Sequence, residues 1–177
     1  MATGQDDIIT LQTSSPSVVQ GFGGDDTFII SDFVLDGTED IQITDTQGNN
    51  EIQLVGGLSI ASSRVLSDTV ELNLSNGSTV TVLGADTFEF ESGGNAVAGV
   101  DGDNESFTDF AQNTLNVTVP AEGEDPVDGG GRTVPDDGGD GGDGDTFTLT
   151  ESANSVDEGG SVSYTVTADQ DITQETQ

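Results

Sequence analysis

The feature that most constrains this chain is a five-residue turn pattern that recurs along its first half, each time just ahead of alternating apolar and polar residues. The pattern is a glycine, any residue, an acid or amide, any residue and an apolar residue. It begins at Gly4, Gly24, Gly37, Gly48 and Gly84. Glycine permits tight turns, and a two-residue alternation places one face of a strand inside and the other in water. The pattern therefore predicts an all-β fold in which turns lead into short strands.

The spacing of these turns predicts how the strands are arranged. Successive motif glycines lie 20, 13, 11 and 36 residues apart, which favours a degenerate parallel β-solenoid, or β-roll, with insertions. The Asn76-Gly77 pair between two alternating runs predicts a hairpin within it. Residues 106–115 begin with a serine that has an acid three positions later. That arrangement predicts a short C-terminal helix capping the end of the strands.

Shifts in composition divide the chain into three parts. Residues 1–120 carry the turn pattern and are predicted to form a β domain. Residues 121–145 are acidic, rich in glycine and aspartate and poor in apolar side chains, so we expect a flexible linker. Residues 146–177 contain short alternating runs that are too few to bury a core. They are predicted to be strands of an incomplete β-sandwich.

Charge and composition exclude several classes of function. The chain has 34 acidic and 2 basic residues, a formal net charge of −32, which opposes binding to nucleic acid or to anionic lipid. No apolar run is long enough to predict membrane insertion, and the residues after Met1 lack the pattern of a secretory signal. Histidine, cysteine and lysine are all absent, which excludes histidine-dependent triads, zinc–thiolate sites and Schiff-base lysines. We therefore predict that the chain is not an enzyme.

Residues 21–29 read GFGGDDTFI and carry the strongest motif in the chain. They differ only at Phe22 from the nonapeptide G-G-x-G-x-D-x-U-x and so resemble the repeats-in-toxin (RTX), or hemolysin-type, calcium-binding proteins. Calcium takes about six to eight oxygen ligands, and carboxylates and free backbone carbonyls supply them. The resemblance implies Ca²⁺ bound between turns of successive coils, so one turn provides only half of the ligands. The predicted metal ligands are Gly4, Asp6, Asp7, Gly21, Gly23, Gly24, Asp25 and Asp26.

The alternative to a calcium site is a purely structural turn. A glycine-rich turn can form without metal, and for the turns at Gly37, Gly48 and Gly84, which lack the preceding glycines, the purely structural interpretation is favoured.

In the tail, residues 155–160 (SVDEGG) and the run SYTVTA resemble the opening strands of a Calx-β or immunoglobulin-like repeat of large bacterial surface proteins.

Together these resemblances imply a calcium-binding structural or adhesive module of a secreted or cell-surface protein. Such a module would leave the cell by type I secretion and fold on calcium outside it. The expected partners are calcium ions, with other copies of the chain or surface glycans as further possibilities. The alternative is a self-assembling subunit of an extracellular filament or surface layer, in which the tail strands add to a neighbour's sheet. A third class is an accessory binding domain of a larger hydrolase.

Overall fold

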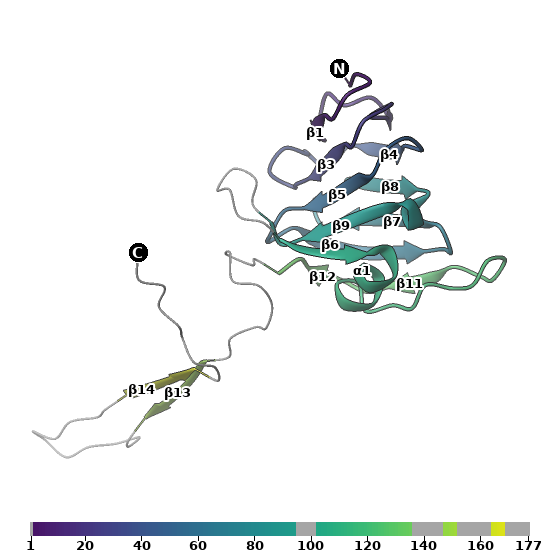
Figure 1. Cartoon of the computed structure of the whole chain (residues 1–177). Coiled ribbons are helices and arrows are strands. Elements are labelled where there is room, and N and C mark those ends of the chain that lie inside the picture. The colour runs from purple at the N-terminus through teal and green to yellow at the C-terminus, as the bar shows by residue number, and fades with distance from the viewer. Residues whose placement is uncertain (1, 95–101, 136–146, 152–163, 169–177) are drawn as a thin grey trace, which may run out of the picture. The chain divides into compact units, whose positions relative to one another are not determined.

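The computed structural model describes residues 2–94 and 102–135 and two strands of the tail, β13 (Phe147–Glu151) and β14 (Tyr164–Ala168). The chain divides into two compact units, Met1–Gly141 and Gly142–Gln177 (Figure 1). In the second unit β13 pairs antiparallel with β14, and Leu149 lies opposite Val166. The remaining tail residues, including the SVDEGG segment, lie outside the described residues.

The described residues of the first unit form two mixed sheets. In the first sheet the strands lie in the order β1-β3-β5-β9-β10, and all neighbours are parallel except β9 and β10. Its strands are β1 (Ile8–Thr10), β3 (Thr27–Ile30), β5 (Asn50–Leu54), β9 (Phe88–Ser92) and β10 (Asp103–Ser106). The prediction of an all-β fold is therefore confirmed for this part of the chain.

The second sheet has the order β11-β6-β7-β8-β4-β2, with β12 also paired to β6. Strands β2, β4 and β8 are parallel, whereas the pairs from β8 through β7 and β6 to β11 are antiparallel. Its strands are β2 (Val18–Val19), β4 (Asp40–Thr44), β6 (Ser59–Val65), β7 (Thr69–Leu74), β8 (Thr79–Leu83), β11 (Val127–Gly129) and β12 (Arg132–Thr133).

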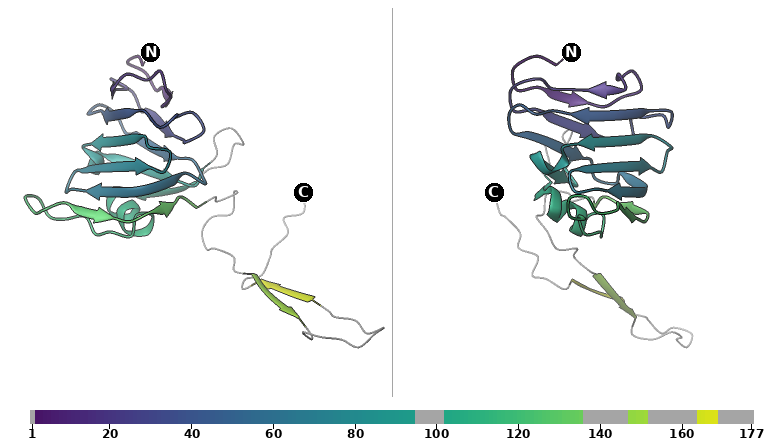
Figure 2. Two further views of the ribbon diagram at one scale, coloured as in Figure 1. Left: turned by 180° about the vertical axis from the view of Figure 1, so that it is seen from behind. Right: turned by 90° about the vertical axis from the view of Figure 1, so that its right-hand side faces the viewer.

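The chain passes back and forth between the two sheets, so that each pass stacks on the one before (Figure 2). Alternating residues of both sheets point into the space between them, where fully buried side chains gather. They include Phe28, Ile30, Ile41, Ile43, Ile52, Leu54, Val80, Val82 and Phe90. Burying a side chain of this size contributes about 1.5–3 kcal/mol. The predicted alternation is thus the source of the core.

The predicted hairpin and helix are both present. Strands β7 and β8 are antiparallel around the Asn76-Gly77 turn, where Gly77 has a φ of 108°. The helix α1 (Phe107–Asn113) begins after Ser106, whose side chain accepts a hydrogen bond from the Asp109 N–H. On its buried face Phe110 stacks on Phe90 with ring centroids 4.4 Å apart. The helix therefore covers the core beside β9 (Figure 1).

The structure corrects the predicted linker over residues 121–145 and the domain boundary at residue 120. Strands β11 and β12 pair with β6, and Val134 is fully buried in the core. The composition suggested too little to bury, but a single valine and the free edge of β6 are enough to hold a glycine-rich segment through backbone hydrogen bonds. The described residues up to 135 therefore belong to the first unit, and 136–145 lie outside the described residues.

Candidate metal site in the stacked acidic turns

The structure brings the two predicted turns together. The pairing of Ile8 with Thr27 places residues 4–7 directly beside residues 23–26. The Asp7 N–H donates to Oδ1 of Asp26 at 2.9 Å, and the Asp25 N–H donates to Oδ1 of Asp6 at 2.9 Å. Each turn thus supplies one carboxylate that accepts a hydrogen bond from a backbone N–H of the other turn. The predicted residues are neighbours because successive passes of the chain stack in register.

A third turn continues the same pattern with amides. The Asn49 N–H donates to Oδ1 of Asp25 at 2.8 Å, and the Asp26 N–H donates to Oδ1 of Asn50 at 3.0 Å. Two ladders of side-chain-to-backbone hydrogen bonds therefore run through the stack in opposite directions. The sequence alone favours a purely structural role for this turn. The signal for its stacking is that Asp26 and Asn50 lie 24 residues apart, as do Asp25 and Asn49.

Asp45, just after β4, is a member of the site that the sequence did not indicate. Its side chain is only 6% exposed. Its Oδ2 accepts hydrogen bonds from the N–H groups of Gly21 at 2.7 Å and Phe22 at 2.8 Å. Phe22 has a φ of 79°, a conformation that favours glycine, and it occupies the position where the nonapeptide has one. Asp45 therefore holds the irregular turn in place.

Asp26 is the most unusual side chain in these turns. It is 1% exposed, and within the described part of the chain its Oδ2 has no hydrogen-bond partner. Burial raises the pKa of Asp26, the hydrogen bond from the Asp7 backbone opposes this, and the charges of Asp45, Asp7 and Asp6 raise the pKa further. Gly21 lies so close that a Cβ at that position would overlap the Asp26 carboxylate. The turn is thus built around an acid that lacks a partner for one of its oxygens.

The carboxylates do not converge on one point. Among residues 2–94 and 102–135, no group of three or more acidic side chains is close enough together to hold a metal ion as it stands. Each of the carboxylates in these turns uses at least one oxygen to accept a backbone N–H group. Within the described turns, the buried carboxylate oxygen without a hydrogen-bond donor is Oδ2 of Asp26. Its chemistry fits a hard cation such as Ca²⁺, which oxygen ligands bind.

Comparison with known protein families, with characterised proteins and with solved structures finds no match to this chain. Within the part of the chain that the structure describes, no helix is both long and apolar enough to cross a membrane.

A second carboxylate shows the opposite electrostatic behaviour. Glu39, in the turn before β4, accepts hydrogen bonds from the Ser78 hydroxyl at 2.8 Å and from the Asp36 and Gly37 N–H groups at 3.1 Å each. Desolvation opposes ionisation, but these hydrogen bonds prevail and lower the pKa of Glu39 to about 2. Its side chain links the turn to the β7–β8 hairpin.

These two shifts predict the pH dependence of stability without calcium. Because the pKa of Asp26 is raised on folding, the folded state binds the proton more tightly, and stability falls as pH rises through that pKa. Because the pKa of Glu39 is lowered, its contribution is complete above about 4.5 and is lost as pH falls through about 2. We expect the unfolding temperature in chelator to rise on mild acidification and to fall again as the pH approaches about 2. If Asp26→Asn leaves the rise unchanged, Asp26 is not its source.

Proposed function

We propose that this chain is a calcium-binding structural module of a secreted or cell-surface protein. In this proposal the first unit is a degenerate parallel β-solenoid whose acidic turns are drawn together by Ca²⁺. The observation that carries it is the buried Asp26 with its unpartnered Oδ2, surrounded by Asp6, Asp7 and Asp45. The proposal includes that the chain has a structural and not a catalytic role.

The physical argument rests on the cost of an unpaired buried charge. An isolated carboxylate loses hydration on burial, and either a proton or a bound cation must compensate. A chain with a net charge of −32 and two basic residues has few cations of its own. Calcium binds carboxylate and carbonyl oxygens in flexible geometry, and extracellular modules bind it with Kd values of about 10⁻⁴–10⁻³ M. The proposal requires Asp6, Asp7 or Asp45 to turn an oxygen toward Oδ2 of Asp26 when the ion binds.

The parallel stacking supports the solenoid part of the proposal. Strands β1, β3, β5 and β9 are parallel neighbours in one sheet, and β2, β4 and β8 are parallel neighbours in the other. The inserted strands β6 and β7 account for the longest interval between stacked strands, 39 residues from Asp40 in β4 to Thr79 in β8. In this stack the acidic turns at residues 4–7 and 23–26 lie side by side, which concentrates negative charge there. Calcium would neutralise that charge and couple binding to folding.

This coupling suggests the biological setting. Where calcium is scarce, repulsion between the turns favours a loose chain, and at extracellular calcium the folded form is favoured by mass action. Export of an unfolded chain by type I secretion, followed by folding at the cell surface, would use this difference. The second candidate is a self-assembling subunit. It is favoured by the tail, where the described strands β13 and β14 pair only with each other, an arrangement that is marginal in isolation.

Calorimetric titration of the full chain tests the proposal. We expect Ca²⁺ to bind with a Kd of about 0.1–1 mM and Mg²⁺ to bind much more weakly, because Mg²⁺ demands a stricter octahedral geometry. The Asp26→Asn variant should lose at least one site. If neither ion binds at several millimolar, the turns are held by their hydrogen bonds alone and the proposal is wrong.

A further inference from the structure

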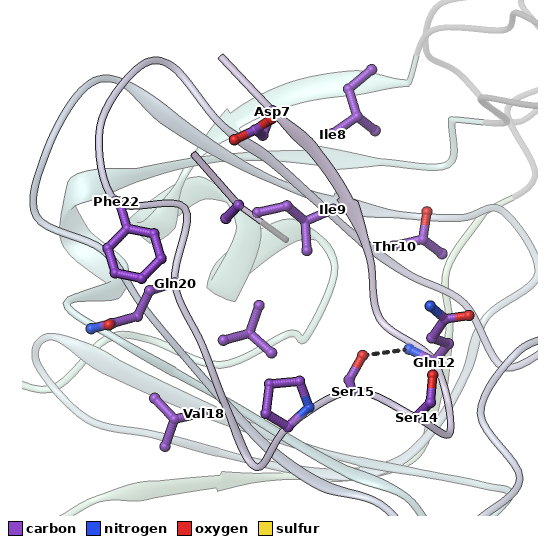
Figure 3. A pocket seen from close by; sticks show the side chains of 13 residues that line it. Asp7, Ile8, Ile9, Thr10, Gln12, Ser14, Ser15, Val18, Gln20 and Phe22 are labelled. Atoms are coloured by element: carbon purple, nitrogen blue, oxygen red, sulfur yellow. Dashed lines mark hydrogen bonds between the residues drawn. The ribbon is translucent and has the colours of Figure 1, made fainter. Parts of the chain in front are cut away.

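Among the described residues, one end of the first unit is open. Strands β1 and β2 are the terminal strands of their sheets at the same end of the stack. Between them lies a hollow of about 480 Å³, lined by apolar side chains that include Ile9, Val19 and Phe22 and by polar ones that include Asp7 and Gln20 (Figure 3). Ile8 is 78% exposed, Phe22 52% and Val18 47%. A cluster of exposed apolar side chains at the edge of two sheets is typical of an interaction surface.

The other end of the core is closed. There α1 packs Phe107 and Phe110 against Phe90, and β11 and β12 cover the edge of β6. At the open end, Thr3 terminates the ladders of side-chain-to-backbone hydrogen bonds. Its N–H and hydroxyl donate to Oδ2 of Asp7 at 2.6 and 2.9 Å. Among the described residues, this end therefore leaves uncovered the two strand edges and the partly apolar hollow between them.

The edges carry hydrogen-bonding groups in a defined order. The Asp7 carbonyl and the Leu11 N–H bond to β3, at 2.9 and 3.0 Å. Since backbone groups alternate in direction along a strand, those of Ile8 and Thr10 are directed away from β3, toward the open edge. In β2 the Ser17 carbonyl bonds to β4, so the groups of Val18 are directed toward the open edge. Each edge can accept one further strand.

We propose that a second copy of the chain docks at this end, related by a two-fold axis perpendicular to the sheets. Strand β1 then lies antiparallel to β1 of the second copy, centred on Ile9, and Ile8 of each copy pairs with Thr10 of the other. Strand β2 meets β2 in the same way, and the two hollows close into one enclosed space in which the exposed Ile8, Val18 and Phe22 of both copies are covered. Both sheets become continuous across the dimer, and the contact continues the strand-on-strand stacking within each copy.

Charge selects this occupant and this orientation. Residues 8–20, which contain both edges and the turn between them, include no acidic residue, although the chain has 34. The perpendicular axis places the acidic turn of each copy over the uncharged turn at residues 11–17 of the other. A two-fold axis parallel to the strands would instead stack acidic turn on acidic turn, which like-charge repulsion disfavours. Strand β1 also lacks the charged residues and prolines that commonly protect an exposed edge.

Sedimentation equilibrium of the full chain in calcium tests the proposal. We expect a monomer–dimer equilibrium that Thr10→Pro weakens by at least about tenfold, since proline removes only the N–H directed at the open edge. Ile8→Asp, at a position that is 78% exposed, should weaken it similarly by placing charge on the edge. Amide exchange at positions 8 and 10 should slow as the protein concentration rises.

Two control variants make the result specific. Phe33→Asp changes an 85% exposed apolar residue in the turn between β3 and β4, and Val166→Pro disrupts the tail strand β14. Both should leave the dimer unchanged. A wild-type chain that stays monomeric at all concentrations overturns the proposal, as does association that survives both edge variants. Loss of the dimer in Val166→Pro alone would assign association to the tail instead.

Discussion

Gly48→Ala is expected to lower the free energy of unfolding by about 4 kcal/mol, because it combines backbone strain with overpacking. Gly48 has a φ of 90°, and a Cβ there would overlap the carbonyl oxygen of Gly24 in the neighbouring turn. The overlap involves backbone on both sides, so no side-chain rotation relieves it. The turns would have to separate, and the ladders through Asp25 and Asp26 would break with them.

Gly57→Ala is the matched control. Gly57 also has a positive φ, 83°, but a Cβ at that position meets nothing within 4 Å. Its expected cost is that of the strained backbone alone, about 1 kcal/mol. Urea unfolding of both variants measures the difference directly. Equal losses would mean that the turns do not approach each other as closely as the structure places them.

Asp26→Asn is expected to have opposite effects in chelator and in calcium. The amide keeps an oxygen that can accept the Asp7 N–H and removes a buried charge from the neighbourhood of Asp6 and Asp45. In chelator at neutral pH, the variant should therefore unfold at a higher temperature than the wild type. In calcium it should lose most of the wild-type gain, because a charged ligand is missing.

Asp86→Asn is the control for this prediction. Asp86 lies in the 3₁₀ turn η1 (Ala85–Thr87), directly before β9, and is exposed. It has the same place in the sequence pattern as Asp26 but not the same burial. Its substitution should change the free energy of unfolding by no more than about 0.5 kcal/mol, both in chelator and in calcium. Equal effects at positions 26 and 86 would show that calcium responds to overall charge and not to the buried acid.

Features that depend on local sequence were predictable. Alternating residues predicted the strands, Asn76-Gly77 predicted the hairpin, and Ser106 with Asp109 predicted the start of α1. The adjacency of the first two acidic turns was also inferred, from resemblance. Each of these features depends on neighbours in sequence or on a repeated motif.

Features that depend on how many residues separate one stacked strand from the next were not predictable. Gly37 shares the turn pattern, yet its φ of 95° serves a close approach to Asn76, and its turn joins Glu39 to Ser78 instead of joining the acidic ladder. Asp45 and Asn50 enter the site because whole passes stack in register, which the turn pattern alone does not encode. The glycine-rich residues after 120 are held by β6, an edge created only by the folded sheet.

The most direct test of calcium binding is thermal unfolding of the full chain in calcium and in chelator at equal ionic strength. At a calcium concentration ten times the Kd, binding adds about 1.4 kcal/mol, which raises the unfolding temperature by several degrees (about 3–6 °C). Magnesium at the same concentration should give a much smaller rise. Melting curves that coincide in calcium and chelator would contradict the account, because the buried acid would then need no cation.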